Sequence, residues 1–462
     1  MLFNSFEFIL AFLPATVVVY FILNAQTKYT AAKIWLLFAS LFFYGWWNPN
    51  YILLILSSMI VNYFLGTQMP GSAFKKELMV TGIVFNLGLL VYYKYANFFI
   101  DNLNRFPQID ITLMQVILPL GISFFTFQQI AYLVDSYQGH TKEYNPISYG
   151  VFVSFFPQLI AGPIVHHQQM MPQFTDPSLN RVNYHNLSKG LFIFLMGLAK
   201  KVIIADSFGI IANKGYGTAE ALSTTQAWVT SLAYSLQLYF DFSGYSAMAI
   251  GLGLFFNIQL PINFNSPYKS RNIQEFWRRW HITLSRFLKD YVYIPLGGNQ
   301  KSESRTLYNL GFTFLLGGIW HGAGWTFMIW GLLHGFALII YRLWSKNSRF
   351  SMPNIIAIPF TFIFVNITWV FFRAPSWDTA STLLERMFIP SSGSAYFTLV
   401  NSMQDYPIWA IGIGLLFMPN SIQIGNRFKP NIKYALLIII LFVLNMTFLN
   451  SVIEQDFLYF DF

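Results

Sequence analysis

Cysteine is absent from all 462 residues of this sequence. The absence excludes disulfide bonds, thiolate metal ligands and an acyl-cysteine intermediate. Any covalent intermediate would therefore form on an oxygen or nitrogen nucleophile. We also expect no metal site, because the adjacent His166 and His167 cannot share one helix face and no carboxylate cluster lies near them in sequence.

Charged residues are scarce. Only 10% of the chain is Asp, Glu, Lys or Arg, whereas 55% is hydrophobic and 19% is aromatic. A soluble domain averages about 25% charged residues, so this chain has too few to cover a water-facing surface. The composition predicts an all-α polytopic membrane protein. Because no linker or repeat interrupts it, we expect a single membrane domain over residues 1–462, with an exported aromatic tail at 451–462.

Apolar runs recur along the whole chain, and a membrane-spanning helix needs roughly 20 such residues. Some runs are short or interrupted by Gly and Pro, which predicts re-entrant or broken helices within a bundle of about 11 to 13 spans. The runs lie at 8–23, 34–47, 52–65, 78–93, 116–134, 147–161, 191–204, 227–256, 307–319, 323–341, 355–372, 409–418 and 434–449.

Lysine and arginine gather between these runs, as the positive-inside rule predicts for cytoplasmic loops. Lys28 and Lys33 follow the first run, whereas residues 451–462 contain three acidic residues and no Lys or Arg. We therefore expect both termini outside the cytoplasm. Loop topology and contact with anionic membrane lipid explain the net charge of +9, so we expect no nucleic-acid partner.

Residues 273–291 have the periodicity of an amphipathic helix, which predicts a helix at the cytoplasmic interface of the membrane. The apolar face contains Phe276, Trp277, Trp280, Leu284, Phe287, Leu288 and Tyr291. The polar face contains Arg278, Arg279, Ser285, Arg286 and Lys289.

Two histidines lie where charged groups are costly, and an ionisable residue at membrane depth is a functional candidate. His281 lies at the edge of the apolar face of the 273–291 helix, and His321 lies between two apolar runs among Gly and Trp. A neutral imidazole can act as a general base on a hydroxyl group. The alternatives are an interfacial His281 bonded to a backbone carbonyl and a His321 that only packs in a Gly-rich helix crossing. We expect His334 to be a packed, hydrogen-bonded histidine and Asp241 to be a structural acceptor.

Six motifs in order along the chain resemble the membrane-bound O-acyltransferase family, and the resemblance covers nearly the whole sequence. The closest branch is the bacterial one that acetylates exported polysaccharides, such as the alginate O-acetylases. The resemblance implies a bundle of that family's type, a catalytic His321 and a second signature histidine at His281. Ala247 stands where alginate-type members carry Asp, so peptidoglycan and cellulose stay open as acceptors. The motifs occupy 156–164, 239–246, 263–268, 276–285, 290–299 and 320–323.

The resemblance further implies a multi-pass enzyme of the bacterial cytoplasmic membrane that uses acetyl-CoA as a substrate and holds no permanent cofactor. Arg278, Arg279, Arg286 and Lys289 are candidates for the phosphates of coenzyme A, although each also has a plain topological role. An exported polysaccharide is the expected acceptor, directly or through a separate extracytoplasmic acyltransferase with a Ser-His-Asp site (SGNH type).

The chain ends in an aromatic segment that contains Tyr459. Related systems use a terminal tyrosine as an acyl carrier, so the resemblance implies that Tyr459 accepts the acyl group near His321. A phenolic ester is a sensible relay in a chain without cysteine. The alternative is interfacial anchoring by aromatic side chains. A transporter or flippase is the rival class, because broken helices and buried polar groups also occur there.

Overall fold

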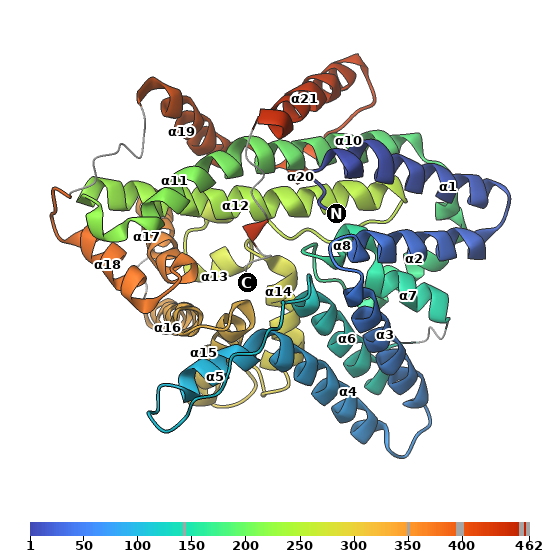
Figure 1. Cartoon of the computed structure of the whole chain (residues 1–462), viewed down its shortest axis with the longest axis horizontal. Helices are drawn as coiled ribbons and strands as arrows, with labels where there is room; N and C mark the ends of the chain where they lie inside the picture. Colours follow the sequence, from blue (N-terminus) through green and yellow to red (C-terminus); the bar gives the residue numbers. More distant parts are fainter. Residues whose placement is uncertain (142–144, 349–351, 394–401, 452–456, 459–462) are drawn as a thin grey trace. The chain divides into compact units, whose positions relative to one another are not determined.

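The computed structural model describes residues 1–462 except 142–144, 349–351, 394–401, 452–456 and 459–462 (Figure 1). Helices and their connections make up the described residues, with no strand among them. The predicted all-α class is confirmed. The chain forms two compact units, each built from distant parts of the sequence. Unit 1 contains residues 1–194, 248–261 and 429–438, and unit 2 contains 195–247, 262–428 and 439–462.

Unit 1 is built mainly from amino-terminal helices that pair in chain order: α1 with α2, and α3 with α4. Asn62 of α3 and Asn86 of α4 are fully buried and exchange amide hydrogen bonds of 3.2 and 2.6 Å. Buried polar side chains in apolar helices need such partners, so this pair fixes how the two helices meet. The helices are α1 (Leu13–Ala25), α2 (Tyr29–Gly45), α3 (Asn50–Gln68), α4 (Lys75–Leu90), α5 (Ala96–Leu103), α6 (Ile122–Tyr137), α7 (Pro146–Ser154), α8 (Phe156–Leu159) and α9 (His167–Thr175).

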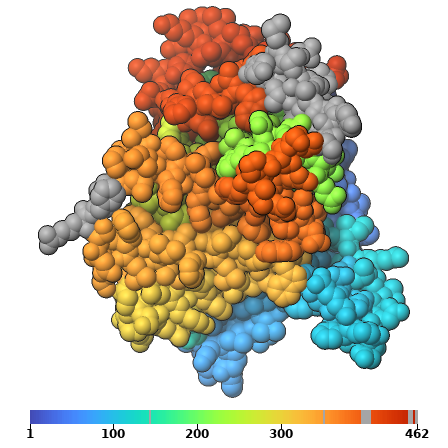
Figure 2. All heavy atoms as spheres, turned by 90° about the vertical axis from the view of Figure 1, so that its left-hand side faces the viewer, coloured from blue at the N-terminus to red at the C-terminus, as the bar shows by residue number. Residues whose placement is uncertain are grey.

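Unit 2 contains the helices that position the two candidate histidines. Helices α15, α16, α17 and α18 contact one another in sequence order and form a continuous surface in Figure 2, coloured yellow to orange. The helices of unit 2 are α11 (Asp206–Gly217), α13 (Ile273–Trp277), α14 (Ile282–Leu288), α15 (Glu303–His321), α16 (Trp325–Asn347), α17 (Asn354–Arg373), α18 (Trp377–Phe388), α19 (Ser402–Phe417) and α20 (Ser421–Gly425). Helices α10 (Tyr184–Ala199), α12 (Thr224–Phe255) and α21 (Ile432–Ser451) contribute residues to both units.

Helices α15 and α16 cross at very short distance, because glycines occupy both sides of the crossing. A Cβ atom added to Gly318 would lie 2.4 Å from the backbone oxygen of Phe327, and one added to Gly331 would lie 2.5 Å from that of Phe314. Small residues allow this close backbone approach between apolar helices. The crossing holds the end of α15, and therefore His321, at a fixed place against α16.

Six helices of the described chain are long and apolar enough to cross a membrane, and two further apolar helices are shorter. Each of the eight overlaps a run expected from the sequence. The expected 11 to 13 spans are not reached by this criterion. Some of the other runs form short or divided helices such as α7 and α8, and two lie in the long helices α12 and α15, which are not apolar enough to meet it. The six are Glu7–Ala25, Asn50–Gln68, Lys75–Leu103, Trp325–Asn347, Asn354–Arg373 and Ile432–Asn450.

Replacing Gly318 by alanine should destabilise unit 2 by about 1–3 kcal/mol, because the added methyl group overlaps a backbone oxygen that cannot move alone. Thermal unfolding of the purified protein in detergent measures the loss. Gly88→Ala is the matched control, because no atom lies within 4 Å of the Cβ position at Gly88. An unchanged unfolding temperature for Gly318→Ala would show that α15 and α16 separate without cost.

Candidate active site

His281 lies at a break between two short helices. Helix α13 ends at Trp277, α14 begins at Ile282, and His281 itself has a left-handed backbone with φ of +42°. The predicted continuous amphipathic helix over 273–291 is therefore wrong. A non-glycine residue rarely adopts this conformation unless surrounding contacts impose it.

Asn263 supplies those contacts from a neighbouring segment. Its side-chain oxygen lies 3.1 Å from Nδ1 of His281 and accepts hydrogen bonds from the backbone N–H (3.2 Å) and hydroxyl (2.9 Å) of Thr283. The backbone oxygen of Asn263 accepts from the N–H of Ile282 at 2.9 Å. The sequence reasoning did not single out Asn263, because nothing in the local pattern shows that it serves a break 18 residues further along.

These contacts also assign the protonation of the His281 ring. The backbone N–H of Thr283 can only donate, so the Asn263 atom that it meets must be the amide oxygen. An oxygen acceptor next to Nδ1 requires that Nδ1 carries the ring proton. The basic nitrogen of His281 is therefore Nε2.

His281 is fully buried, and its bond to Asn263 replaces the backbone carbonyl contact expected for an interfacial histidine. The edge of the Phe242 ring meets it at 4.8 Å between centroids, and Trp320 lies 6.2 Å away. This surrounding is apolar, so a neutral imidazole is favoured there over a charged one.

His321 is the last residue of α15, and the chain turns through the extended Gly322 and Gly324 before α16 begins. The ring is buried between Trp320, Trp330 and Phe372, with centroid distances of 4.9, 5.0 and 5.1 Å. Its centroid lies 6.5 Å from that of His281. The fold therefore brings together two histidines that are 40 positions apart in the printed sequence.

His334 matches its expected structural role. Its Nδ1 accepts a hydrogen bond from the indole N–H of Trp277 at 3.2 Å, and its Nε2 lies 2.9 Å from the hydroxyl of Thr368. With both ring nitrogens engaged in a fully buried position, His334 fastens α13 to α16 and α17.

Asp241 belongs to a buried ionic cluster that sequence reasoning recognised only in part. Nζ of Lys201 lies 2.9 Å from Asp241 and 2.7 Å from Asp206, and all three side chains are nearly inaccessible. Sequence analysis gave Asp241 an acceptor role, which is confirmed, but it missed Lys201 and Asp206. Three ionisable residues in apolar segments were the available signal, since such residues occur in pairs when buried.

The carboxy-terminal segment packs against the same helix as this cluster. The backbone N–H of Leu458 donates to Oδ2 of Asp241 at 3.0 Å, and the ring of Phe457 stacks on Tyr245 at 4.5 Å. Phe457 also lies 5.8 Å from Phe242, whose ring contacts His281. Tyr459, the predicted acyl carrier, lies outside the described residues and follows Leu458 directly in the sequence.

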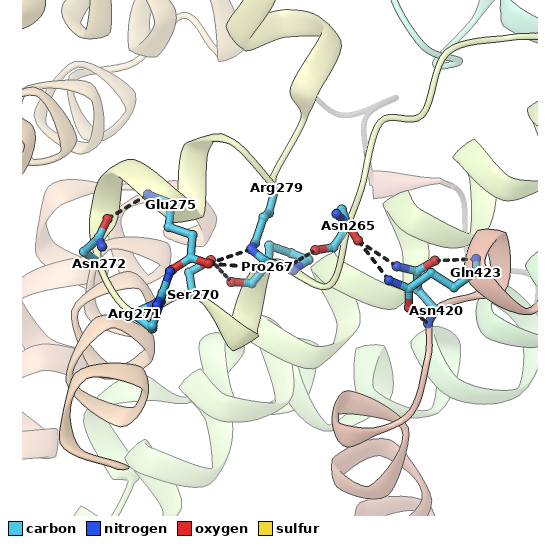
Figure 3. A network of polar contacts seen from close by, with 9 residues as sticks. All are labelled: Asn265, Pro267, Ser270, Arg271, Asn272, Glu275, Arg279, Asn420 and Gln423. Atoms are coloured by element: carbon cyan, nitrogen blue, oxygen red, sulfur yellow. Dashed lines mark hydrogen bonds and ion pairs between the residues drawn. The ribbon is translucent and has the colours of Figure 1, made fainter. Parts of the chain in front are cut away.

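A polar pocket of about 390 Å³ lies beside α13. Figure 3 shows part of its wall, where Glu275 bonds to Arg271 and Arg279 while Asn265 faces Asn420 and Gln423. Burial raises the pKa of Glu275, but the two arginines outweigh it and hold that pKa below its usual value, so Glu275 stays ionised. The lining residues are Asn265, Arg271, Asn272, Gln274, Glu275, Arg278, Arg279 and Tyr341.

The four predicted donor-binding residues separate in the structure. Arg278 and Arg279 line the pocket together with Arg271 and the carboxylate of Glu275. Arg271 and Arg279 form ion pairs with that carboxylate. Arg286 and Lys289 lie beyond the break and approach Asp290 at 3.6 and 3.4 Å instead. The break at His281 explains the separation, because a continuous helix would have carried all four on one face.

Comparison with known proteins decides the family. Residues 122–374 match the membrane-bound O-acyltransferase family model. The chain belongs to that family. It is 52% identical to the peptidoglycan O-acetyltransferase of Helicobacter pylori over 419 residues, which cover 84% of this chain and 80% of that protein.

Two further relatives of this acyltransferase carry different names. The probable alginate O-acetylase of Pseudomonas aeruginosa is 40% identical, over 84% of this chain and 75% of its own. The teichoic acid D-alanyltransferase of Bacillus subtilis is 30% identical, over 53% of this chain and 66% of its own. The protein is a multi-pass membrane O-acyltransferase, so the transporter alternative is wrong.

Replacing Asn263 by alanine should lower the kcat for acyl transfer about 10- to 100-fold, because His281 loses the acceptor that fixes its tautomer and the left-handed turn loses its support. The KM for the acyl donor should stay close to that of the wild type. Steady-state kinetics in detergent measures both constants. Asn213→Ala, at an exposed position of the same unit, is the matched control. A wild-type kcat for Asn263→Ala would exclude a positioning role.

Proposed function

We propose that this acyltransferase moves acetyl groups from cytoplasmic acetyl-CoA to an exported polysaccharide of the bacterial cell envelope. The observation that carries the proposal is the pair of buried histidines, 6.5 Å apart, beside a docked carboxy-terminal segment. The names of the relatives, an acetyltransferase for peptidoglycan and a probable acetylase for alginate, support an acetyl group and a glycan. The proposed location is the cytoplasmic membrane, with both termini outside the cytoplasm.

The pocket beside α13 is the proposed site for the phosphates of acetyl-CoA. Arg271, Arg278 and Arg279 offer forked donors that suit phosphate oxygens, and Glu275 holds two of them in place. Arg278 is exposed, so its guanidinium group is accessible to a ligand from water. Arg286 and Lys289, which were predicted for the same role, would contribute only at longer range.

His321 is the proposed general base and Tyr459 the proposed first acceptor. His321 takes the phenol proton as the oxygen attacks the thioester carbonyl carbon. A new C–O bond forms, the C–S bond breaks, and the proton passes from His321 to the leaving thiolate to give free coenzyme A. In the second transfer, a hydroxyl of the next acceptor attacks the acetyl carbonyl carbon of the tyrosyl ester. A new C–O bond forms, the bond between the acetyl carbon and the phenol oxygen breaks, and the proton lost by the hydroxyl goes to the phenolate to restore Tyr459. General-base help is typically worth about 10²–10⁴-fold, so positioning must supply much of the remaining acceleration.

His281 is proposed to orient the acyl donor by accepting a hydrogen bond at Nε2 from an N–H group of the donor. With the ring proton on Nδ1, Nε2 has no hydrogen to donate to a carbonyl oxygen or an oxyanion. Its fixed tautomer keeps the lone pair on one known atom, and its apolar surrounding strengthens any polar contact made there. Because Asn263 bonds to Nδ1, the His281 ring keeps its orientation and does not need to reorganise during the reaction.

Peptidoglycan is the acceptor that the comparisons favour over alginate. Identity to the peptidoglycan O-acetyltransferase is 52%, compared with 40% for the probable alginate O-acetylase. Ala247 also stands where the resemblance implies an Asp in alginate-type members. We further propose that a separate extracytoplasmic acyltransferase of SGNH type completes delivery. Tyr459 would hand the acetyl group to that partner or directly to the glycan.

Mass spectrometry of the tail peptide tests the relay directly. Full-length protein is incubated with acetyl-CoA that carries ¹³C in the acetyl group, and the peptide that contains residues 457–462 is analysed. We expect a labelled acetyl group on Tyr459 of the wild type, and none in His321→Ala or Tyr459→Phe. His185→Ala, at an exposed histidine, is the matched control and should keep the label. Folded wild-type protein that binds the donor yet acquires no label would refute the relay.

Replacing Arg278 by alanine should raise the KM for acetyl-CoA about tenfold and leave kcat nearly unchanged. The loss corresponds to one charge-assisted hydrogen bond to phosphate, about 1.5 kcal/mol. Thioester consumption at varied donor concentration gives both constants. Arg305→Ala, an exposed arginine on α15 outside the pocket, should leave the KM unaltered. If the two substitutions gave equal KM values, the pocket would not be the donor site.

A further inference from the structure

The carboxy-terminal segment docks on one face of α12, within unit 2. Tyr245 lies four positions after Asp241 and three after Phe242, so each of these two residues is its neighbour on the helix surface. Tyr245 stacks on Phe457, Phe242 contacts the same ring, and Asp241 accepts the N–H of Leu458. Phe457 and Leu458 are 3% and 8% exposed, so these two residues fill space inside the unit.

The two oxygens of Asp241 have different partners. Oδ1 lies 2.9 Å from Nζ of Lys201, a partner on the body of the protein, whereas Oδ2 accepts from the tail at 3.0 Å. Lys201 also binds Asp206, so the cluster contains two carboxylates for one ammonium group. A buried carboxylate oxygen needs a donor, and a backbone N–H bonded to a charged acceptor is among the stronger hydrogen bonds.

We propose that Asp241, held in place by Lys201, is a positioning residue that fixes the register of the tail on α12. Together with the stack of the Phe457 ring on Tyr245, the bond from the Leu458 N–H to Asp241 fixes which tail residue stands at the cluster and which residue follows it. Because Leu458 stands there, the next residue in the chain is Tyr459. This inference rests on the proposed relay for its purpose, but the docking itself does not depend on acyl transfer.

Hydrogen–deuterium exchange of the full-length protein without acetyl-CoA tests the docking. Leu458→Pro removes the N–H while the Lys201–Asp206–Asp241 cluster stays intact, and Leu458→Ala removes only side-chain atoms. The remaining amides of the peptide 457–462 should exchange about 10- to 100-fold faster in Leu458→Pro than in Leu458→Ala. Equal exchange in the two variants would overturn the proposal.

Asp241→Asn tests the other side of the bond, because it keeps an acceptor oxygen but removes the charge. The tail amides should exchange faster than in Asp378→Asn, an exposed control on α18, and by a smaller factor than in Leu458→Pro. An Asp241→Asn protein with the exchange of the control would contradict the role of the carboxylate. Asparagine has nearly the same shape, which limits the damage to folding.

Labelled acetyl-CoA then shows whether Asp241 positions Tyr459 for acetylation or only stabilises the docked tail. In Leu458→Pro the KM for acetyl-CoA should stay at the wild-type value, while acetylation of Tyr459 falls at least about tenfold and hydrolysis of the thioester by water persists. Acetylation of Tyr459 at the wild-type rate would overturn the positioning role. An unlabelled tail in the wild type would instead refute the relay, and the exchange data would still decide whether Asp241 holds the tail.

Discussion

Asn263 stabilises the interruption of the helix at His281, and the rest of the site depends on that interruption. A left-handed backbone costs a non-glycine residue about 1–2 kcal/mol. Asn263 offsets this cost through its side-chain contacts with His281 and Thr283 and its backbone bond to Ile282. Each such bond contributes about 0.5–1.5 kcal/mol, so together they exceed the strain. The turn that they stabilise brings His281 to face His321 instead of lying on the surface of a helix.

Two polar clusters of unit 2 differ in their environment: the residues that line the pocket beside α13, and the cluster of Lys201, Asp206 and Asp241. The pocket beside α13 is polar and open to water, with three guanidinium groups that an anion can approach. The Lys201 cluster is closed, and its charges are satisfied by one another and by a backbone N–H. Aromatic side chains surround both histidines, with Phe242 against His281 and Trp330 against His321. An apolar lining of this kind keeps an imidazole neutral and therefore able to accept a proton.

Composition and the apolar runs were sufficient to predict the all-α class and the positions of the six long apolar helices. Isolated polar residues in apolar segments are visible in one sequence, and they pointed to His281 and His321 as buried candidates. The break at His281 was not predictable in the same way. The helical spacing of apolar residues continues from Phe276 to Tyr291, and neither Gly nor Pro marks the interruption. Its cause lies in Asn263, which acts across space. The same error placed Arg286 and Lys289 beside Arg278.

In the proposed relay, the tail must bind near the histidines and also leave them, so its docking has to combine accuracy with reversibility. A covalent tether supplies a high local concentration, which allows weak contacts to suffice. The contacts at Asp241 are of two kinds, those within the body of the protein and those made by the tail. The ion pair between Lys201 and Asp241 joins two residues outside the tail, so it does not depend on the tail being docked. The tail itself contributes the Leu458 hydrogen bond and the Phe457 ring stack, both of which can be exchanged for other partners. In the proposed relay, Asp241 is the permanent group that fixes the register, and the contacts made by the tail itself are few enough to be broken in each cycle.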